Sequence, residues 1–190
     1  MYLLCFHGRI SLVKDLFIEM SFDLAFSQWL YNFYFLSDLA YLFSGRIFSG
    51  FLLFSIGFYF YKIKQLKTFI FICVITGLGD FIGNLLKDVF LQPRPCFSDI
   101  QYFPELDKCG YQLTGMPSNH ALNFFTFSTL VHLMLKNKII SFILFFFSIL
   151  VALSRVLLVK HLLSQVIIGS IIGIFLAFTA FKISRRWIKV

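Results

Sequence analysis

Two long apolar runs constrain this chain more than any other feature. Residues 139–153 and residues 166–181 contain no charged side chain, and only a short polar patch separates them. About 20 consecutive apolar residues are needed for a helix to cross the hydrocarbon core of a bilayer. Of the 190 residues, 59% are hydrophobic and 28 are phenylalanine, which is more apolar surface than a soluble domain of this length can bury. The sequence therefore predicts an all-α integral membrane protein.

Charged and polar breaks divide the chain into five predicted spans. These are residues 47–61, 68–89, 118–135, 139–157 and 162–181. Residues 21–45 mix apolar and polar side chains, with Trp29 and several tyrosines suited to headgroup depth, so we expect amphipathic helices in the membrane interface. The alternative for this stretch is a sixth span, kinked around Asp38. Residues 1–20 are too interrupted by charge to cross a bilayer, and a short interfacial helix is expected there.

Lysine and arginine are distributed unevenly between the two ends of the predicted bundle. One set of connections and the tail carry nine of them and no acidic residue: Lys62, Lys64, Lys67, Lys136, Lys138, Lys182, Arg185, Arg186 and Lys189. Because cytoplasmic loops are enriched in these residues, this end is predicted to face the cytoplasm. The connections at 88–117 and 154–161 then share the outer face. The net charge of +8 is consistent with contact with anionic lipid. The sequence has no basic run interleaved with aromatic residues, so it does not suggest nucleic-acid binding.

Three polar clusters fall at the predicted outer face. The first reads KDVFLQPRP and contains Lys87 and Arg94. The second reads PSNH at residues 117–120, where a predicted span begins. The third reads SRVLLVKHLLSQ at residues 154–165. Ionisable groups near a bilayer are costly unless they are paired or used, so their concentration at one face indicates a functional site.

The residues of these clusters suit an anionic phosphoryl group. Three cations are available, Lys87, Arg94 and Arg155, and the planar fork of an arginine matches phosphate oxygens. Ser118 is placed at a helix N-terminus, where free backbone N–H groups favour an anion. His120 and His161 provide the pair that a nucleophile and a general acid require. Gln165 follows His161 by four residues on one helical face, where its carbonyl can accept from the imidazole and leave Nε2 free.

The three clusters resemble the motifs of the PAP2 superfamily (type 2 phosphatidic acid phosphatases), which read K-x6-RP, PSGH and SR-x5-H-x3-D. The first motif matches completely. Asn119 stands where the second motif has glycine, and Gln165 stands where the third has aspartate. The matched window covers residues 87–165, nearly half of the chain. Because three motifs occur in the expected order, spacing and membrane face, the resemblance is specific.

The resemblance implies a role for each matched residue. His161 is expected to be the nucleophile that forms a phosphohistidine, and His120 the acid that protonates the departing oxygen. Gln165 is expected to orient His161 without the negative charge of an aspartate. The implied phosphate-binding residues are Lys87, Arg94, Ser118, Asn119 and Arg155. The resemblance implies no metal and no cofactor, and no carboxylate cluster in the sequence suggests a metal.

The resemblance also implies a function, which is hydrolysis of a lipid phosphate or diphosphate at the outer, periplasmic face of the inner membrane. The short chain is similar to the compact bacterial undecaprenyl-diphosphatase branch, so undecaprenyl diphosphate is an expected substrate. Alternatives are a lipid A or phosphatidylglycerophosphate phosphatase or phosphotransferase, and an inactive protein that binds lipid headgroups. Residues 1–190 are then expected to form one PAP2-like membrane domain, with an interfacial segment at 1–45 and a catalytic helical bundle at 47–183.

Two further features allow structural and functional interpretations. Cys96 and Cys109 both fall in the predicted outer loop, and in an oxidising periplasm a disulfide between them would brace that loop. Asp80, Asn84 and Lys87 follow one another at helical spacing and form a polar stripe on one face of a span. The stripe either holds Lys87 in place or contacts a neighbouring helix, and the contact between helices is the favoured interpretation.

Overall fold

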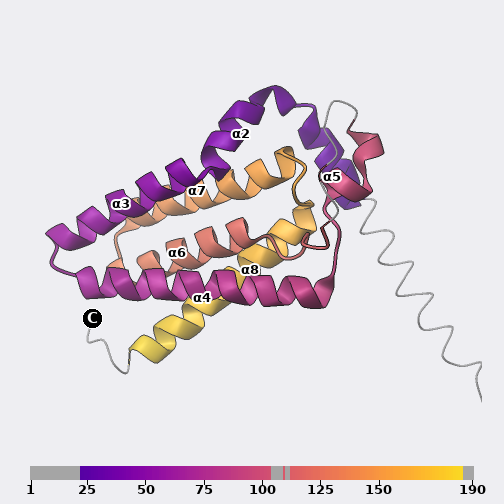
Figure 1. Cartoon of the computed structure of the whole chain (residues 1–190). Coiled ribbons are helices and arrows are strands. Elements are labelled where there is room, and N and C mark those ends of the chain that lie inside the picture. The colour runs from indigo at the N-terminus through magenta and orange to yellow at the C-terminus, as the bar shows by residue number, and fades with distance from the viewer. Residues whose placement is uncertain (1–21, 104–108, 110–111, 186–190) are drawn as a thin grey trace, which may run out of the picture.

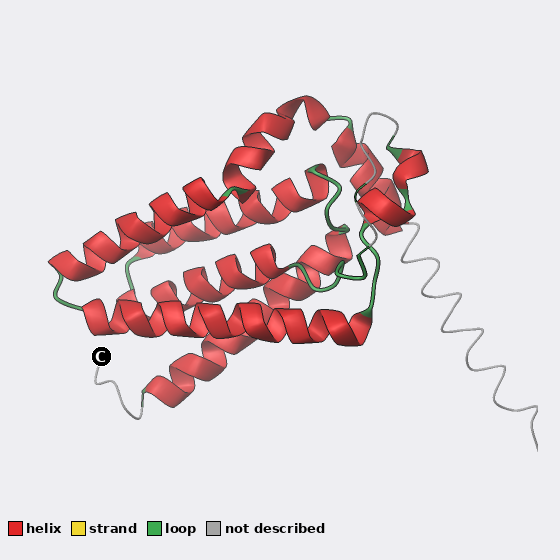
Figure 2. Ribbon diagram, in the orientation of Figure 1, coloured by secondary structure: helices red, strands yellow, loops and turns green. Residues whose placement is uncertain are grey.

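The computed structural model describes residues 22–103, 109 and 112–185. Within these residues the chain forms helices joined by loops and contains no strand (Figure 2). The all-α class predicted from the apolar runs is therefore confirmed. The interfacial helix predicted for residues 1–20 lies outside the described residues.

Five long helices run side by side and form the bundle (Figure 1). They are α3 (Arg46–Lys62), α4 (Leu66–Phe90), α6 (Asn119–Leu135), α7 (Lys138–Leu157) and α8 (Leu163–Ser184). Each corresponds to one of the five predicted spans, with boundaries that differ by a few residues, as is usual for helix ends.

Judged by helix length and hydropathy, the described part of the structure contains fewer candidate membrane spans than the five or six expected from the sequence. Among the described residues, the segment that begins with α4, together with α7 and α8, gives three spans that are long and apolar enough to cross a membrane. A fourth is obtained if α3 is joined with the preceding helical segment, which is bent against it by 45°. The remaining long helix, α6, has only 17 residues and buries several hydroxyl side chains. Because other helices surround α6, it needs no continuous apolar face toward lipid.

Helix α6 lies at the centre of the bundle, where it packs against α4, α7 and α8. Small residues let α8 come very close to it. A Cβ at Gly173 would overlap the backbone oxygen of Leu122, and a Cβ at Gly169 would lie 2.6 Å from the backbone oxygen of Ser118. This contact fixes the first turns of α6, which carry part of the second polar cluster, against the first turns of α8.

Gly173→Ala is expected to lower the stability of the bundle. The added methyl group would meet backbone that cannot move aside, and such overpacking costs about 1–3 kcal/mol. The measurement is the thermal unfolding midpoint in detergent. Gly77→Ala is the matched control, because a Cβ there would meet nothing within 4 Å. Equal midpoints for the two variants would contradict the close contact between α6 and α8.

The N-terminal helices lie across one end of the bundle (Figure 1). Residues 22–31 are helical, and they are followed by η1 (Tyr34–Leu36) and by α2 (Ser37–Ser44), which packs on α7. Trp29 and Phe35 remain 55% and 77% exposed, which is typical of helices in the membrane interface. The chain bends at Gly45, between α2 and α3, and Asp38 lies in the first turn of α2. The chain therefore breaks at Gly45 rather than at Asp38.

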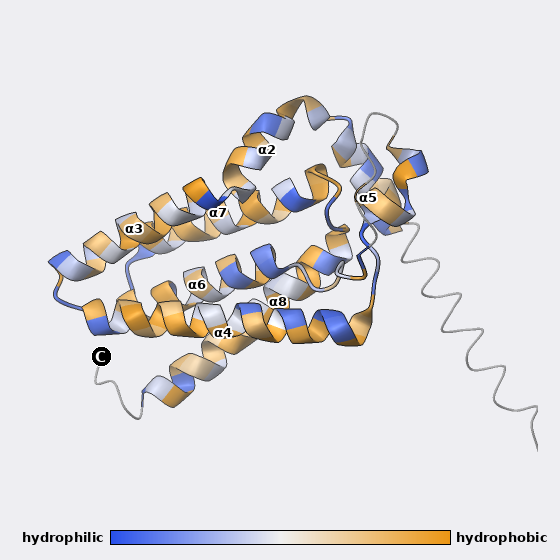
Figure 3. Cartoon of the chain, viewed as in Figure 1, coloured by the Kyte–Doolittle hydropathy of each residue, from blue (hydrophilic) through white to orange (hydrophobic). Residues whose placement is uncertain are grey.

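The two ends of the bundle carry different connections. The α3–α4 turn, the α6–α7 turn and the end of α8 lie together at one end, with the described members of the cationic set (Figure 1). Two further members, Arg186 and Lys189, lie outside the described residues. At the opposite end are α5 (Pro95–Ser98), η2 (Ile100–Tyr102) and the loops before α6 and α8. Hydrophilic residues gather on the helix ends there (Figure 3). Residues of all three polar clusters line one cavity at this end.

Candidate active site

A cavity of about 470 Å³ lies between α3, α4 and α6 at the end of the bundle where the polar clusters meet. Six of the eight residues implied by the motifs line it: Lys87, Arg94, Asn119, His120, Arg155 and His161. Ser118 and Gln165 are not in the lining. The rest of the wall combines polar groups of α4 and α6 with apolar side chains, among them Leu52, Leu53, Phe124 and Phe127. The cavity therefore suits an amphiphile with an anionic head.

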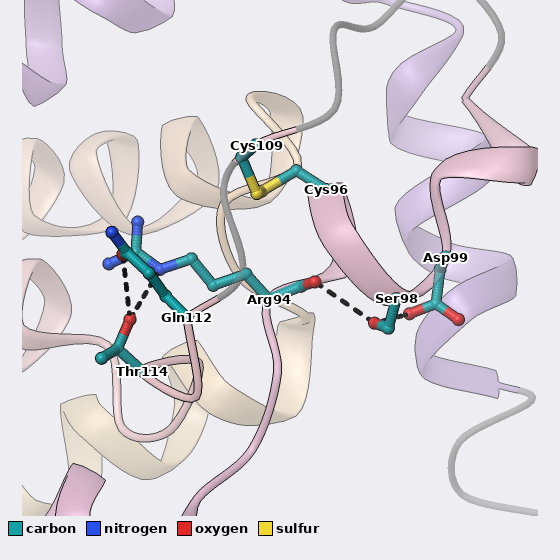
Figure 4. The surroundings of a disulfide bond; sticks show 7 residues. All are labelled: Arg94, Cys96, Ser98, Asp99, Cys109, Gln112 and Thr114. Atoms are coloured by element: carbon teal, nitrogen blue, oxygen red, sulfur yellow. Dashed lines mark hydrogen bonds between the residues drawn. A yellow bond between two sulfur atoms is a disulfide. The ribbon is translucent and has the colours of Figure 1, made fainter.

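Three cations reach this cavity from three different elements. Lys87 lies in the last turn of α4. Arg94 is the N-cap residue of α5, and its Nε donates to Thr114 Oγ1 at 3.1 Å (Figure 4). Arg155 lies in the last turn of α7, and its buried Nε has no hydrogen-bond partner among the described residues. Asp80 is the one carboxylate in the described lining, so the cavity favours an anion.

His161 lies in the loop between α7 and α8 and is only 2% exposed. Its Nδ1 is 2.7 Å from the backbone oxygen of Gly115. Because a carbonyl oxygen only accepts, Nδ1 carries the proton and donates, and Nε2 keeps its lone pair. Two residues earlier, Val159 has a φ of 52°, a left-handed conformation that is rare for a β-branched residue. This turn lets the backbone N–H groups of Lys160 and His161 both donate to Arg155 O.

The environment of His161 favours its neutral form. Burial is the main cause, and together with the positive charge of Arg155 it lowers the pKa of His161 well below its ordinary value of 6.5. The hydrogen bond to Gly115 acts in the opposite direction. A nucleophilic imidazole must be unprotonated, so the form needed for attack persists as the pH falls through 6.5.

We expect the ring-nitrogen NMR resonances of His161 to stay those of a neutral imidazole when the pH is lowered through 6.5. The physical reason is the lowered pKa, which places protonation at a more acidic pH. The resonances are assigned by their loss in His161→Ala. A titration midpoint at or above 6.5 would contradict this account of the site.

The structure corrects the contact expected for Gln165. The direct hydrogen bond from His161 to its side chain is not formed, because Gly115 O already occupies Nδ1. Instead, Gln165 Oε1 accepts from Leu162 N at 3.1 Å and caps the first turn of α8. Gln165 Nε2 donates to Gln92 Oε1 at 3.2 Å. The side chain is 1% exposed, so Gln165 lies behind the site rather than in its wall.

Ser118 and Asn119 stand at the start of α6 but face different surroundings. Ser118 is the N-cap residue, and its Oγ is fully buried without a partner among the described residues. Asn119 lines the cavity, where its Nδ2 lies 3.0 Å from Asp80 Oδ1 and 2.8 Å from Asn84 Oδ1. Asn123 Nδ2 also donates to Asp80 Oδ1, at 2.9 Å. The polar stripe of α4 therefore contacts a neighbouring helix, in agreement with the favoured interpretation.

A disulfide joins Cys96 and Cys109 beside the site (Figure 4). Cys96 follows Arg94 by two residues, so the bond fixes the segment that carries this cation. Cys96 N also donates to Val159 O at 3.1 Å, which ties the same segment to the loop that carries His161. The disulfide therefore ties the first motif segment to Cys109 in the loop before α6, and the hydrogen bond ties it to the third motif segment.

Several residues around the site were not singled out from the sequence. Asp23, from the N-terminal helix, is buried and accepts from Ser164 N in the first turn of α8 at 2.8 Å. Gln92 occupies an unspecified position of the first motif, and Gly115 belongs to a loop without a motif. These contacts join residues far apart in the chain and leave no local pattern.

Among the described residues, no three His, Cys, Asp or Glu side chains are grouped to hold a metal ion.

Comparison with known proteins agrees with the motifs. The family model of the PAP2 superfamily matches residues 68–189, which is more than half of the chain. The chain belongs to the PAP2 superfamily. It is therefore a membrane phosphatase of the PAP2 type, a class of lipid phosphatases.

A solved structure has a similar fold. It is described as the first transmembrane PAP2 type phosphatidylglycerolphosphate phosphatase from Bacillus subtilis. The match has a TM-score of 0.65 at 18% sequence identity and covers 87% of this chain and 88% of that one. At this identity the likeness shows a shared fold. No curated protein matches the chain.

Proposed function

We propose that this protein hydrolyses a lipid phosphate or diphosphate at the outer face of a bacterial inner membrane, without a metal ion and through a phosphohistidine on His161. One observation carries the proposal. Three cations and two histidines converge in one cavity whose wall is also partly apolar. The proposed activity is of the same class as that of the structural neighbour, a phosphatidylglycerolphosphate phosphatase.

The cations provide the binding site for the phosphoryl group. Lys87, Arg94 and Arg155 line one cavity although they come from separate elements. The buried Nε of Arg155 lacks an acceptor among the described residues, and an unsatisfied buried donor costs about 1–3 kcal/mol. A phosphate oxygen would satisfy it. Fixed positive groups around the transferring oxygens supply the electrostatic stabilisation on which phosphoryl transfer chiefly depends.

The two histidines divide the chemistry between them. Nε2 of His161 attacks the terminal phosphorus, a P–N bond forms, and the bond from that phosphorus to the leaving-group oxygen breaks. The leaving group is the lipid alcohol for a monophosphate and the lipid monophosphate for a diphosphate. His120 gives its proton to the departing oxygen. Water then attacks the phosphohistidine, returns a proton to His120 and releases inorganic phosphate. His161 is suited to the first step because its hydrogen bond to Gly115 leaves Nε2 unprotonated.

The shape and chemistry of the cavity support a lipid substrate. Along α4 the lining extends from Lys87 to Thr76, eleven residues and about 16 Å of helix. A phosphate held near Lys87 therefore leaves room for the attached chain beside Leu52 and Phe127. The cationic set at the opposite end of the bundle supports a site at the outer face, since cytoplasmic ends are rich in Lys and Arg.

The test is phosphate release from purified protein in detergent, with EDTA present and no divalent metal added. The panel contains undecaprenyl diphosphate, phosphatidylglycerophosphate, phosphatidic acid and lipid A. Release from at least one lipid is expected, and the lipid with the highest kcat/KM is the substrate. Appearance of the phosphate on a second lipid would indicate a phosphotransferase instead. Headgroup binding without any turnover would indicate an inactive binding protein, and activity only with added metal would contradict the mechanism.

A further inference from the structure

A closed ring of hydrogen bonds lies behind His161, outside the cavity lining. His161 Nδ1 donates to Gly115 O at 2.7 Å, and Gly115 N donates to Gln92 O at 2.8 Å. Gln165 Nε2 donates to the side-chain oxygen of Gln92 at 3.2 Å. Gln165 Oε1 accepts from Leu162 N at 3.1 Å. Because Leu162 follows His161 in the chain, the ring returns to the residue from which it began.

Position 115 is the narrowest point of the ring, and only glycine fits there. A Cβ at Gly115 would overlap Pro93 O and would lie 2.8 Å from Gln165 Nε2. The backbone of Gly115 is thus held between the segment that carries Gln92 and the first turn of α8. The α8 side is itself anchored, because Ser118 N donates to Gln165 O at 3.1 Å.

We propose that Gln92 is a positioning residue for His161, acting through Gln165 and Gly115. The inference rests on the proposed function of His161 as nucleophile. Gln92 holds Gly115 through its backbone and Gln165 through its side chain, so both supports of the His161 loop meet at one residue. Its backbone oxygen holds Gly115, whose own oxygen faces Nδ1. Its side chain holds Gln165, which in turn binds Leu162 N next to His161. Together these contacts keep Nε2 unprotonated and directed at the cavity.

The ring also couples the nucleophile to the phosphate-binding segment. Gln92 stands two residues before Arg94, and Arg94 lines the cavity. Any shift of this segment moves both the cation that binds phosphate and the support of the nucleophile. The two therefore keep their relative position, which matters because a misplacement of about 1 Å can cost about 100-fold in rate.

Substitutions that keep the approximate size of the side chain and change its hydrogen-bonding groups test the proposal. Gln92→Leu keeps the size of the side chain and removes its acceptor. Gln92→Glu keeps an acceptor for Gln165 Nε2, and Gln165→Glu keeps one for Leu162 N while the amide of Gln92 turns to donate. The double variant Gln92→Glu, Gln165→Glu places two carboxyl groups opposite each other, which share one proton at low pH and have no donor between them once both are ionised at high pH. The readouts are kcat, KM, the yield of phosphohistidine and the ring-nitrogen NMR resonances of His161.

We expect Gln92→Leu to lower kcat by about 100-fold with KM changed less than about 3-fold, and to produce a mixture of His161 tautomers. The double variant should show the same loss at a pH where both carboxyl groups are ionised, and the single and double Glu variants are compared at that pH. Each single Glu variant should stay within about 5-fold of wild type. Wild-type kcat and a single tautomer in Gln92→Leu, or equal losses in the single and double Glu variants, would overturn the role of Gln92. Should Gln92→Leu fail to fold, the single and double Glu variants decide. A wild-type protein that forms no phosphohistidine would instead refute the proposed function.

Discussion

Replacing His161 by alanine is expected to abolish phosphate release, by at least about 10⁴-fold in kcat, because the proposed mechanism places the covalent intermediate on His161 alone. His120 lines the same cavity but serves as the acid in the proposed reaction. The cations remain in place, so the variant should still bind lipid phosphate. The measurement is release of inorganic phosphate together with binding of the substrate lipid in detergent.

His132→Ala is the matched control for this substitution. His132 lies in the last turn of α6, where its Nδ1 is 3.0 Å from Ser141 Oγ, and it is not in the cavity lining. Its replacement removes the same side chain from the same fold and should leave kcat within a few-fold of wild type. Activity that survives in His161→Ala, or that is lost equally in both variants, would remove the mechanism.

Arg155→Leu is expected to lower kcat/KM by about 10²–10³-fold, the usual cost of losing one donor that stabilises transition-state charge. The leucine keeps much of the buried volume and removes the cation, including the Nε that has no hydrogen-bond partner in the described part of the chain. Arg155→Lys should recover only part of the loss, since lysine restores charge without the planar fork. The measurements are kcat/KM and competitive inhibition by inorganic phosphate.

Lys160→Ala separates a direct contact from the general field of the cations. Lys160 is a neighbouring cation that does not line the cavity. Removing it takes away the same charge from the same loop region, and kcat/KM should change by less than about 5-fold. Comparable losses in Arg155→Leu and Lys160→Ala would show that Arg155 acts only through long-range electrostatics.

The sequence predicts the helices of this protein, and it predicts that the candidate site residues share one face of the bundle, for a physical reason. Spans are specified by local apolar runs, and Lys87, Arg94, Arg155 and the two histidines keep fixed spacings within short segments. Their shared face followed from counting the spans, and the structure brings them into one cavity. Features that depend on short stretches of sequence, such as the spans and the motif spacings, can therefore be predicted from the sequence.

The supports of the site could not be predicted in the same way. Gln165 was expected to bind His161 because the two are four residues apart, but a backbone oxygen from residue 115 takes that position. Asp23 reaches Ser164 across 141 residues, and Gln92 reaches Gln165 across 73. The burial of Ser118 likewise depends on how closely α8 approaches α6. Such contacts arise from tertiary packing, which no spacing in the sequence encodes.

Trapping the phosphorylated enzyme tests the central claim most directly. Wild-type protein is mixed with its ³²P-labelled lipid substrate in EDTA, quenched in alkali within the first turnovers, and digested for mass spectrometry. The proposed mechanism predicts an alkali-stable, acid-labile phosphoryl group on His161 that disappears on a chase with unlabelled lipid. Phosphate release without a labelled intermediate, or a label on any residue other than His161, would contradict it.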